Sequence, residues 1–266
     1  MKLRLSCILT ITVFVTCFLA SLSSAKLDPE TYIGVWKFDE GNGDIAKDST
    51  ENEHDGQFVD DLKWVDGKYG DALEFDGSGY IDLGNAESLQ FDGSVTIVFW
   101  AKPENVAAGR KNIVCKSFGG EGCLTQEVNG TMSFYWGDCG GNCEPYVEVQ
   151  RPPAGTIVDD QWMHIAHVRD VDKRQYLMYK DGEVVANGTW NKCGAHPCGD
   201  SKASELNLFI GHGYAGRYIG ILDEVAIIGA VLSEDDIHKI MDNGFDELAD
   251  VAPSGKLATT WAKLKR

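Results

Sequence analysis

The feature that most constrains the fold of this chain is one stretch, residues 160–185, in which apolar and polar side chains tend to alternate in two runs. A period of two places alternate side chains on one buried face of a β-strand. Asp181-Gly182 interrupts the second run between Tyr179 and Val184, and this pair readily adopts the positive φ angles of a tight hairpin turn. The stretch therefore predicts antiparallel strands, each with one buried face.

Strand-like runs of similar length recur along most of the chain. Turn dipeptides such as Asp76-Gly77, Asp92-Gly93 and Asn129-Gly130 lie between them. The runs cover residues 33–38, 72–75, 79–83, 95–101, 112–116, 124–128, 131–136, 146–149, 162–169, 175–180, 183–186, 206–211 and 220–228. Many short strands with regular turns are typical of a sandwich or jelly roll. We predict an all-β fold, a two-sheet antiparallel jelly-roll sandwich.

One short C-terminal helix completes this prediction. Ser233 is a favourable N-cap residue, and the acidic residues 234–236 suit the positive end of a helix. Ile237 and Ile240 form an apolar stripe, and Gly244 is placed to end the helix.

The N-terminus has the pattern of a secretory signal peptide. Lys2 and Arg4 precede an apolar run over residues 5–20, and small residues at 23–25 suit a cleavage site. We therefore predict a signal peptide at 1–25, one jelly-roll domain at 26–248, and a linker with a short basic amphipathic tail at 249–266. The tail either docks on the acidic domain or serves as a tag for a partner, or it is a frayed end. The predicted location is extracellular or at the cell surface.

The charge balance excludes two classes of partner. Loss of Lys2 and Arg4 with the signal peptide changes the formal net charge from −17 to −19. Such acidity disfavours binding to nucleic acid and to anionic membranes. It is compatible with cation binding, although solubility explains most of these carboxylates more simply.

Six cysteines remain after the signal peptide is removed, and an even number in an exported chain predicts disulfides. We expect local pairs, with cross-pairing of the last two loops as the main alternative. A zinc site that includes His196 is disfavoured because the cysteine spacings differ from the usual zinc-binding pairs. The predicted pairs are Cys115–Cys123, Cys139–Cys143 and Cys193–Cys198.

Several segments in the same order resemble the laminin-G-like branch of the concanavalin A-like lectin and glucanase jelly rolls. They are the opening strand and turn at 35–41, the segment at 69–77, the strand at 95–101, the hairpin at 162–185, and the closing segments at 222–227 and 232–237. The resemblance covers nearly the whole mature chain. It implies a jelly roll that acts as an extracellular recognition module.

The resemblance also implies a calcium site near the point where the first and last strands meet. Asp39, Asp48 and Asp223 are the candidate ligands, with Glu40 and Glu224 in reserve. The alternative is that Asp39 and Asp223 are charges that deter pairing at a sheet edge.

Catalytic motifs are not found in the sequence. Related laminarinase-type jelly rolls carry a Glu-x-Asp-x-x-Glu run, which has no counterpart in this chain. Adjacent acids such as Asp223 and Glu224 are expected on opposite faces of a strand, as are His164 and His167. We therefore predict that the protein is not an enzyme, and a glycoside hydrolase or polysaccharide lyase is the less favoured reading.

Two glycine-rich loops are the candidate ligand site, because each lies beside a tryptophan and polar groups that suit sugar binding. Phe134 and Trp136 are expected on one face of a strand, and Tyr135 on the other. The candidate residues are Trp136, Asp138, Tyr146, Trp190, Asn191 and His196. The predicted function is a secreted, non-catalytic module that binds an extracellular glycan or glycoprotein, with calcium as a candidate cofactor. The alternative is a protein-binding adhesion or matrix module.

Overall fold

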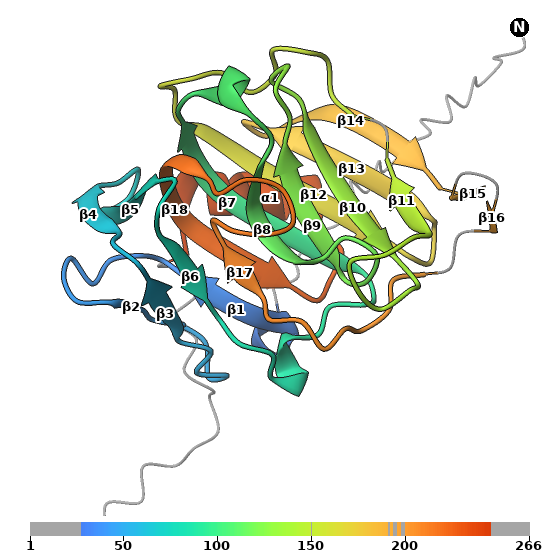
Figure 1. Cartoon of the computed structure of the whole chain (residues 1–266), viewed down its shortest axis with the longest axis horizontal. Helices are drawn as coiled ribbons and strands as arrows, with labels where there is room; N and C mark the ends of the chain where they lie inside the picture. Colours follow the sequence, from blue (N-terminus) through green and yellow to red (C-terminus); the bar gives the residue numbers. More distant parts are fainter. Residues whose placement is uncertain (1–27, 150, 191, 194–195, 198–199, 246–266) are drawn as a thin grey trace, which may run out of the picture.

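The computed structural model describes residues 28–149, 151–190, 192–193, 196–197 and 200–245, with the side chains of 192–193 and 196–197 left undescribed. The predicted signal peptide and the whole of the predicted tail lie outside these residues. The described residues form two antiparallel β-sheets stacked face to face, as predicted for a jelly-roll sandwich (Figure 1). Within this part of the chain, no helix has the length and apolar character needed to cross a membrane.

Sheet 1 lies on the side of α1, the one α-helix among the described residues. Its strands, in spatial order, are β14 (Glu183–Thr189), β13 (Gln175–Lys180), β12 (Met163–Asp170), β7 (Val95–Pro103), β18 (Ile219–Ile228), β5 (Asp71–Asp76) and β4 (Lys63–Asp66), and β1 (Tyr32–Trp36) also pairs with β18. The centre of the sheet joins strands that are far apart in the sequence, because β7 lies between β12 and β18.

Sheet 2 forms the other layer. Its strands, in spatial order, are β11 (Tyr146–Glu148), β10 (Met132–Gly137), β9 (Gly122–Gln126), β8 (Lys111–Ser117), β17 (Phe209–Ile210), β6 (Tyr80–Asp82), β3 (Gly56–Val59) and β2 (Ile45–Ala46). A separate ribbon pairs β15 (Lys192–Cys193) with β16 (His196–Pro197), and the short 3-10 helices are η1 (Pro29–Thr31), η2 (Glu87–Leu89) and η3 (Val106–Ala108).

The hairpin predicted from residues 160–185 is present. β12 pairs with β13, and β13 turns into β14 through Asp181 and Gly182, whose φ angles are +51° and +83°. Glycine also leaves room at this turn, since a Cβ on Gly182 would lie 2.3 Å from the ring of His238. The expectation of one buried face is wrong for β12, because all of its residues are buried.

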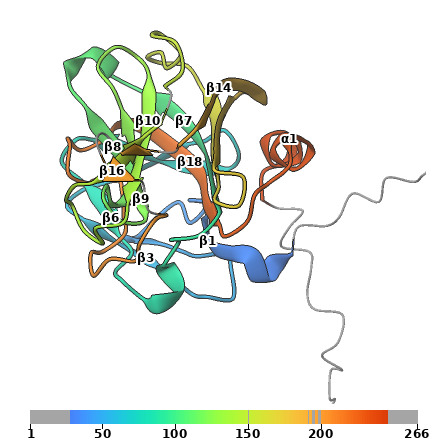
Figure 2. The ribbon, with the colours of Figure 1, turned by 90° about the vertical axis from the view of Figure 1, so that its right-hand side faces the viewer.

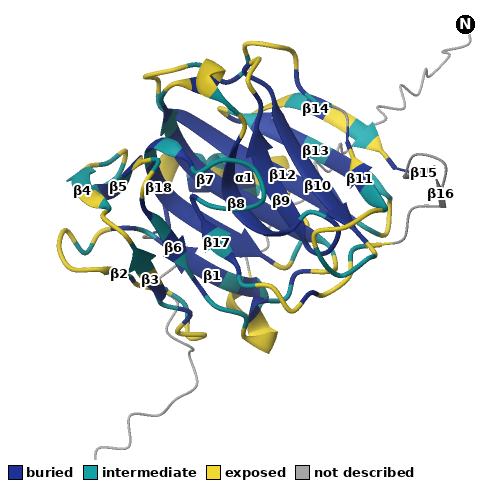
Figure 3. Ribbon diagram, viewed as in Figure 1, coloured by how far each residue is buried: buried dark blue, intermediate teal, exposed yellow. Residues whose placement is uncertain are grey.

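The helix explains this second buried face. α1 (Glu234–Asn243) begins at Ser233, whose hydroxyl accepts a hydrogen bond from Asp236 N, and ends at Gly244, as predicted. It packs on the outer face of sheet 1, on the side away from sheet 2 (Figure 2). Apolar residues of β1, β7, β12, β13 and β18 form a second core with Ile237 and Ile240 there. The main core lies between the sheets, and exposed residues concentrate in the connecting loops (Figure 3).

Candidate functional site

The two tryptophans predicted to bind ligand belong to the core. Trp136 is 0% exposed and Trp190 is 3% exposed. Their rings meet edge to face with centroids 5.0 Å apart. Phe134 and Trp136 do share the inward face of β10, as expected, but that face is the one that packs against sheet 1. The prediction is therefore corrected: proximity to a glycine-rich loop did not expose either indole.

Tyr135, the neighbour that points the other way, begins a different cluster. Four rings on the outer face of sheet 2 form a closed set, which we call the aromatic quartet: Phe118, Tyr135, Tyr146 and Tyr214. Successive centroids lie 5.4 Å apart for Phe118–Tyr146, 5.7 Å for Tyr146–Tyr135, 6.1 Å for Tyr135–Tyr214 and 4.7 Å for Tyr214–Phe118. Tyr135 is buried beneath the others, which are each partly exposed.

Local structure explains how distant residues reach this cluster. Tyr146 lies opposite Gly137 in the pairing of β10 with β11, and the glycine has no side chain to compete for the space. The N–H of Phe118 donates to Asn142 Oδ1 at 3.1 Å. The Oδ1 atom of Asn112 accepts a 2.7 Å hydrogen bond from the N–H of the residue that follows Tyr214.

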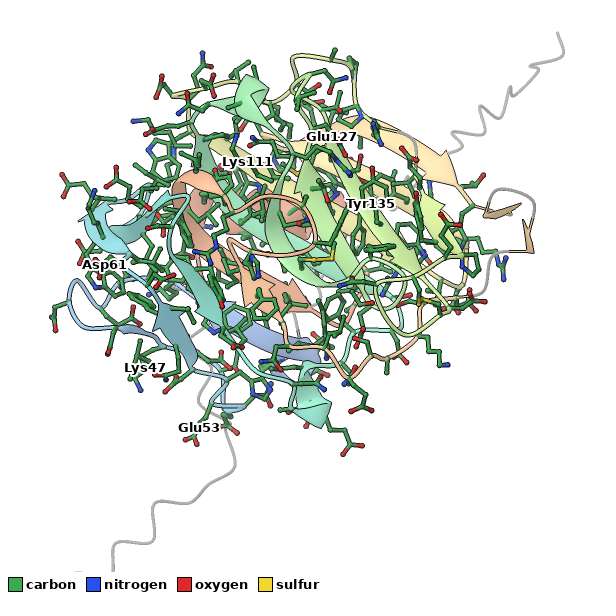
Figure 4. The ribbon with its side chains drawn as sticks, in the orientation of Figure 1. Lys47, Glu53, Asp61, Lys111, Glu127 and Tyr135 are labelled. Atoms are coloured by element: carbon green, nitrogen blue, oxygen red, sulfur yellow. A yellow bond between two sulfur atoms is a disulfide. The ribbon has the colours of Figure 1, made fainter. Side chains whose placement is uncertain are left out.

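A charged network anchors the quartet at Tyr135. Its hydroxyl donates to Glu127 Oε1 at 3.0 Å and accepts from Arg151 at 2.6 Å and from Arg110 at 3.2 Å. Arg110 also donates to Glu127 Oε2 at 2.9 Å and to the Tyr214 hydroxyl at 2.9 Å. Burial, with nearby carboxylates, raises the pKa of Tyr135 to about 12, so the phenol stays protonated and remains a donor. Figure 4 shows Tyr135 and Glu127 among the side chains of this sheet.

Two predicted disulfides are present and support the same face. Cys115–Cys123 links β8 to β9, and Gly213 packs on it so closely that a Cβ would lie 2.5 Å from Cys115 Sγ. Cys139–Cys143 closes the loop between β10 and β11. The predicted pair Cys193–Cys198 lies outside the described side chains.

The remaining predicted ligand residues have different positions. Tyr146 is a member of the quartet, and Asp138 is exposed at the start of the Cys139–Cys143 loop. Asn191 and the side chain of His196 lie outside the described residues. Sequence reasoning missed Phe118, Tyr214 and the charged network. The outward alternation of Tyr135 was the signal that pointed to this face.

The three predicted calcium ligands are not brought together. Asp48 holds its own loop, because its carboxylate accepts hydrogen bonds from the backbone N–H groups of Val35, Thr50 and His54. Asp39 accepts from Asp71 N at 3.1 Å and forms an ion pair with Lys37. Among the described residues, no three acidic, histidine or cysteine side chains are grouped as a metal site. Calcium binding therefore stays a prediction.

Asp223 and Glu224 form a buried acidic pair instead, and the expectation that they lie on opposite faces is wrong. The register of β18 shifts between Asp223 and Ala226, and Glu224 has a φ of +51°. This bulge turns both carboxyls to the helix side, where Asp223 Oδ2 accepts from Lys68 N and Tyr69 N, and Glu224 Oε2 accepts from Phe245 N. Burial raises the pKa of each to about 7. The pair fastens two loops to β18 and has no open face for a substrate.

The histidine prediction is confirmed. His164 faces the helix side, with its ring centroid 5.2 Å from that of Trp100, whereas His167 lies between the sheets against Tyr176 and Met132. His164 and His167 therefore do not form a joint site.

Comparison with known proteins agrees with this architecture. A family model described as the concanavalin A-like lectin/glucanases superfamily matches residues 75–238, which is more than half of the chain. The chain belongs to this superfamily. A comparison with curated proteins gives no significant match.

Solved structures similar to this superfamily member have low sequence identity. Domain 4 of an extracellular arabinanase from Geobacillus stearothermophilus, in complex with arabinotriose, has a TM-score of 0.59 at 18% identity, over 79% of this chain and 98% of that one. The binding domain of Paraclostridial Mosquitocidal Protein 1 has a TM-score of 0.59 at 14% identity, over 82% and 53%. Trypanosoma rangeli sialidase in complex with sialic acid has a TM-score of 0.54 at 16% identity, over 84% and 34%.

The chain spans about half of that toxin binding domain and about a third of that sialidase. These likenesses therefore establish the fold, which is shared by binding domains and enzymes.

Proposed function

We propose that the mature chain is a secreted, non-catalytic module that binds extracellular carbohydrate or glycoconjugate through the aromatic quartet. The observation that carries this proposal is the grouping of three partly exposed rings, Phe118, Tyr146 and Tyr214, around a buried Tyr135. Sugar rings present apolar C–H faces that stack on aromatic rings, while fixed polar groups bind their hydroxyls. The Arg110–Glu127–Arg151 network offers such groups in a preorganised arrangement.

The carboxylates on this face support a non-catalytic role. A retaining glycosidase needs two carboxyl groups about 5 Å apart, one of them free to donate a proton. Glu127 pairs with Arg110, and Glu148 pairs with Arg151. A carboxylate that is engaged in an ion pair with arginine is not free to donate a proton to a leaving group.

Binding to sugar is favoured over binding to protein by the distribution of exposed apolar residues. A protein-binding face of this kind would be a contiguous apolar patch of several hundred square ångströms. The large apolar side chains that are exposed in the described chain are Val128, Val184, Leu206 and Val231, which come from four different segments. Two structural neighbours, the arabinanase domain with arabinotriose and the sialidase with sialic acid, are carbohydrate complexes and support the proposal at the level of fold.

A glycan array probed with the unreduced mature protein tests the proposal. We expect selective binding, and we expect Tyr146→Ala to reduce it at least fivefold because a stacking ring contributes about 1 kcal/mol. Leu177→Ala, at a partly buried site on the outer face of sheet 1, is the matched control. Equal binding by the wild type and Tyr146→Ala, or no binding of the wild type to any glycan on the array, would refute the proposal.

The same array, run with calcium and with chelator, tests the predicted cofactor. Binding that is lost in chelator would support calcium assistance. Binding that is unchanged in chelator would leave a calcium-independent module.

A further inference from the structure

A second group of aromatic side chains lies on the outer face of sheet 2. Tyr80 on β6, Phe209 on β17 and His212 in the following loop pack together, with centroids 4.5 Å apart for Tyr80–His212, 5.1 Å for Phe209–His212 and 5.5 Å for Tyr80–Phe209. All three are partly exposed. Their neighbours Ile81 and Ile210 point into the core, so strand alternation directs these rings outward. We call them the aromatic trio.

The trio is held in place by charge pairing at its edge. The Arg217 guanidinium lies 5.0 Å from the centroid of the Tyr80 ring, and its Nη1 atom is 3.2 Å from Asp60 Oδ2. Burial and the adjacent Arg217 lower the pKa of His212, so this ring is neutral at neutral pH. A neutral imidazole beside two aromatic rings leaves an apolar surface that suits a sugar face.

One loop connects the trio to the quartet. His212 belongs to the trio and Tyr214 to the quartet, with Gly213 between them on the Cys115–Cys123 disulfide. The loop is fixed to β8 by hydrogen bonds from Gly211 N to Ile113 O at 2.7 Å and from Asn112 N to Gly216 O at 2.9 Å. The two clusters are therefore held at a constant distance from each other.

The strand order sets the length of the combined surface. β11, which carries the partly exposed Tyr146, is separated by five strand intervals from β6, which carries Tyr80, in the order β11-β10-β9-β8-β17-β6 (Figure 1). Strands lie about 4.8 Å apart, so these two rings are roughly 24 Å apart across the sheet. His212 and Tyr214, which are two residues apart, join the two clusters between them. A single sugar ring cannot contact both Tyr146 and Tyr80, whereas a chain of linked sugars that crosses the strands can.

We infer that the quartet and the trio are two subsites of one extended site, which binds an internal stretch of a neutral polysaccharide rather than one terminal sugar. This inference rests on the proposed function. The preference for a neutral chain follows because the arginines at both clusters are in ion pairs with Glu127, Glu148 and Asp60. The protein as a whole carries a net charge of −17, which disfavours an anionic polymer.

Calorimetric titration with oligosaccharides of increasing length tests the extended site. The probes are arabinan, xylan, β-1,3-glucan and β-1,4-glucan fragments, each from monosaccharide to hexasaccharide. We expect affinity for at least one series to rise with length and then level off. Tyr80→Ala should lower affinity for the hexasaccharide about fivefold to tenfold and leave the disaccharide unaffected, since a stacked ring is worth roughly 1 kcal/mol. Leu177→Ala on sheet 1 is again the control.

The outcomes separate this inference from the proposed function. If the disaccharide binds as tightly as the hexasaccharide and Tyr80→Ala has no effect, the second subsite is refuted, while binding at the quartet stands. If no fragment or array glycan binds the wild type, the proposed function itself fails. Thermal unfolding of each variant establishes that lost binding does not reflect a lost fold.

Discussion

Replacing Asp223 with asparagine tests the electrostatics of the buried acidic pair. Asp223 is 0% exposed, and its Oδ1 atom has no hydrogen-bond partner among the described residues. Burial raises the pKa of Asp223 from 3.8 to about 7. The negative charge of nearby Asp39 adds to this rise, and the backbone hydrogen bonds oppose it. Asparagine has the shape of the protonated acid, and its amide oxygen can accept the same hydrogen bonds from Lys68 N and Tyr69 N.

The sign of the effect follows from proton linkage. A carboxyl group whose pKa is higher in the folded chain binds more protons when folded, so protons stabilise the fold. This stabilisation is complete below the unfolded value of about 4 and is lost as the pH rises through about 7. The interval between pH 5 and the folded pKa is about two pH units, and each pH unit changes the free energy of unfolding by about 1.4 kcal/mol. We expect wild type to lose about 3 kcal/mol relative to Asp223→Asn between pH 5 and pH 8.

Urea unfolding of the unreduced protein at pH 5, 6, 7 and 8, followed by tryptophan fluorescence, measures this difference. Glu224 titrates in the same range and is coupled to Asp223, so the measured change belongs to the pair. Asp76→Asn is the control: hydrogen bonds from Ser78 lower the pKa of this exposed carboxyl, which is therefore ionised throughout. A wild-type minus Asp223→Asn difference that stays constant from pH 5 to pH 8 would refute the reasoning.

Three further predictions concern a buried histidine, a buried tyrosine and a loop disulfide. Burial lowers the pKa of His167 to about 3, so the fold loses stability as the pH falls below about 6.5. Between pH 7 and pH 5 the free energy of unfolding of the wild type should fall by about 2 kcal/mol for this reason. His167→Gln should abolish this part of the pH dependence in the same urea titration. Tyr135→Phe leaves Glu127 without one donor and should cost roughly 1–3 kcal/mol in thermal unfolding, together with weaker glycan binding. Replacing both Cys139 and Cys143 with serine opens a short loop and should cost about 2 kcal/mol; unchanged unfolding would contradict the stabilising role of this disulfide.

Much of the secondary structure could be predicted because strand and helix signals are local. Every predicted strand overlaps an observed one, and the helix begins after Ser233 and ends at Gly244 as expected. The missed strands are β2, β3, β4, β15 and β16, and all of them are short. The residues of β2, β3 and β4 are mostly partly or fully exposed, so these strands lack a strong apolar pattern. Because their sequences alternate only weakly, these strands are extended mainly because they pair with a neighbouring strand.

The candidate site was predicted less well, and the reason lies in the direction of the side chains. Tyr146 was expected in the site and lies in the quartet. Trp136 and Trp190 were expected to be exposed in the site, but both are buried in the core. Alternation shows that Tyr135 and Trp136 point oppositely without showing which face meets the other sheet. Phe118 and Tyr214 are nearly a hundred residues apart, so only the folded chain brings their rings to 4.7 Å.

The sequence by itself determined the class of fold, the positions of most strands, the helix and its cap, and the family resemblance, because periodicity, turn dipeptides and capping act over a few residues. The tertiary structure decided which strands are neighbours, which face of sheet 2 is outward, and that α1 buries the second face of β12. It also decided that a bulge turns Asp223 and Glu224 to one side. These features depend on pairing between distant segments, which local periodicity does not encode.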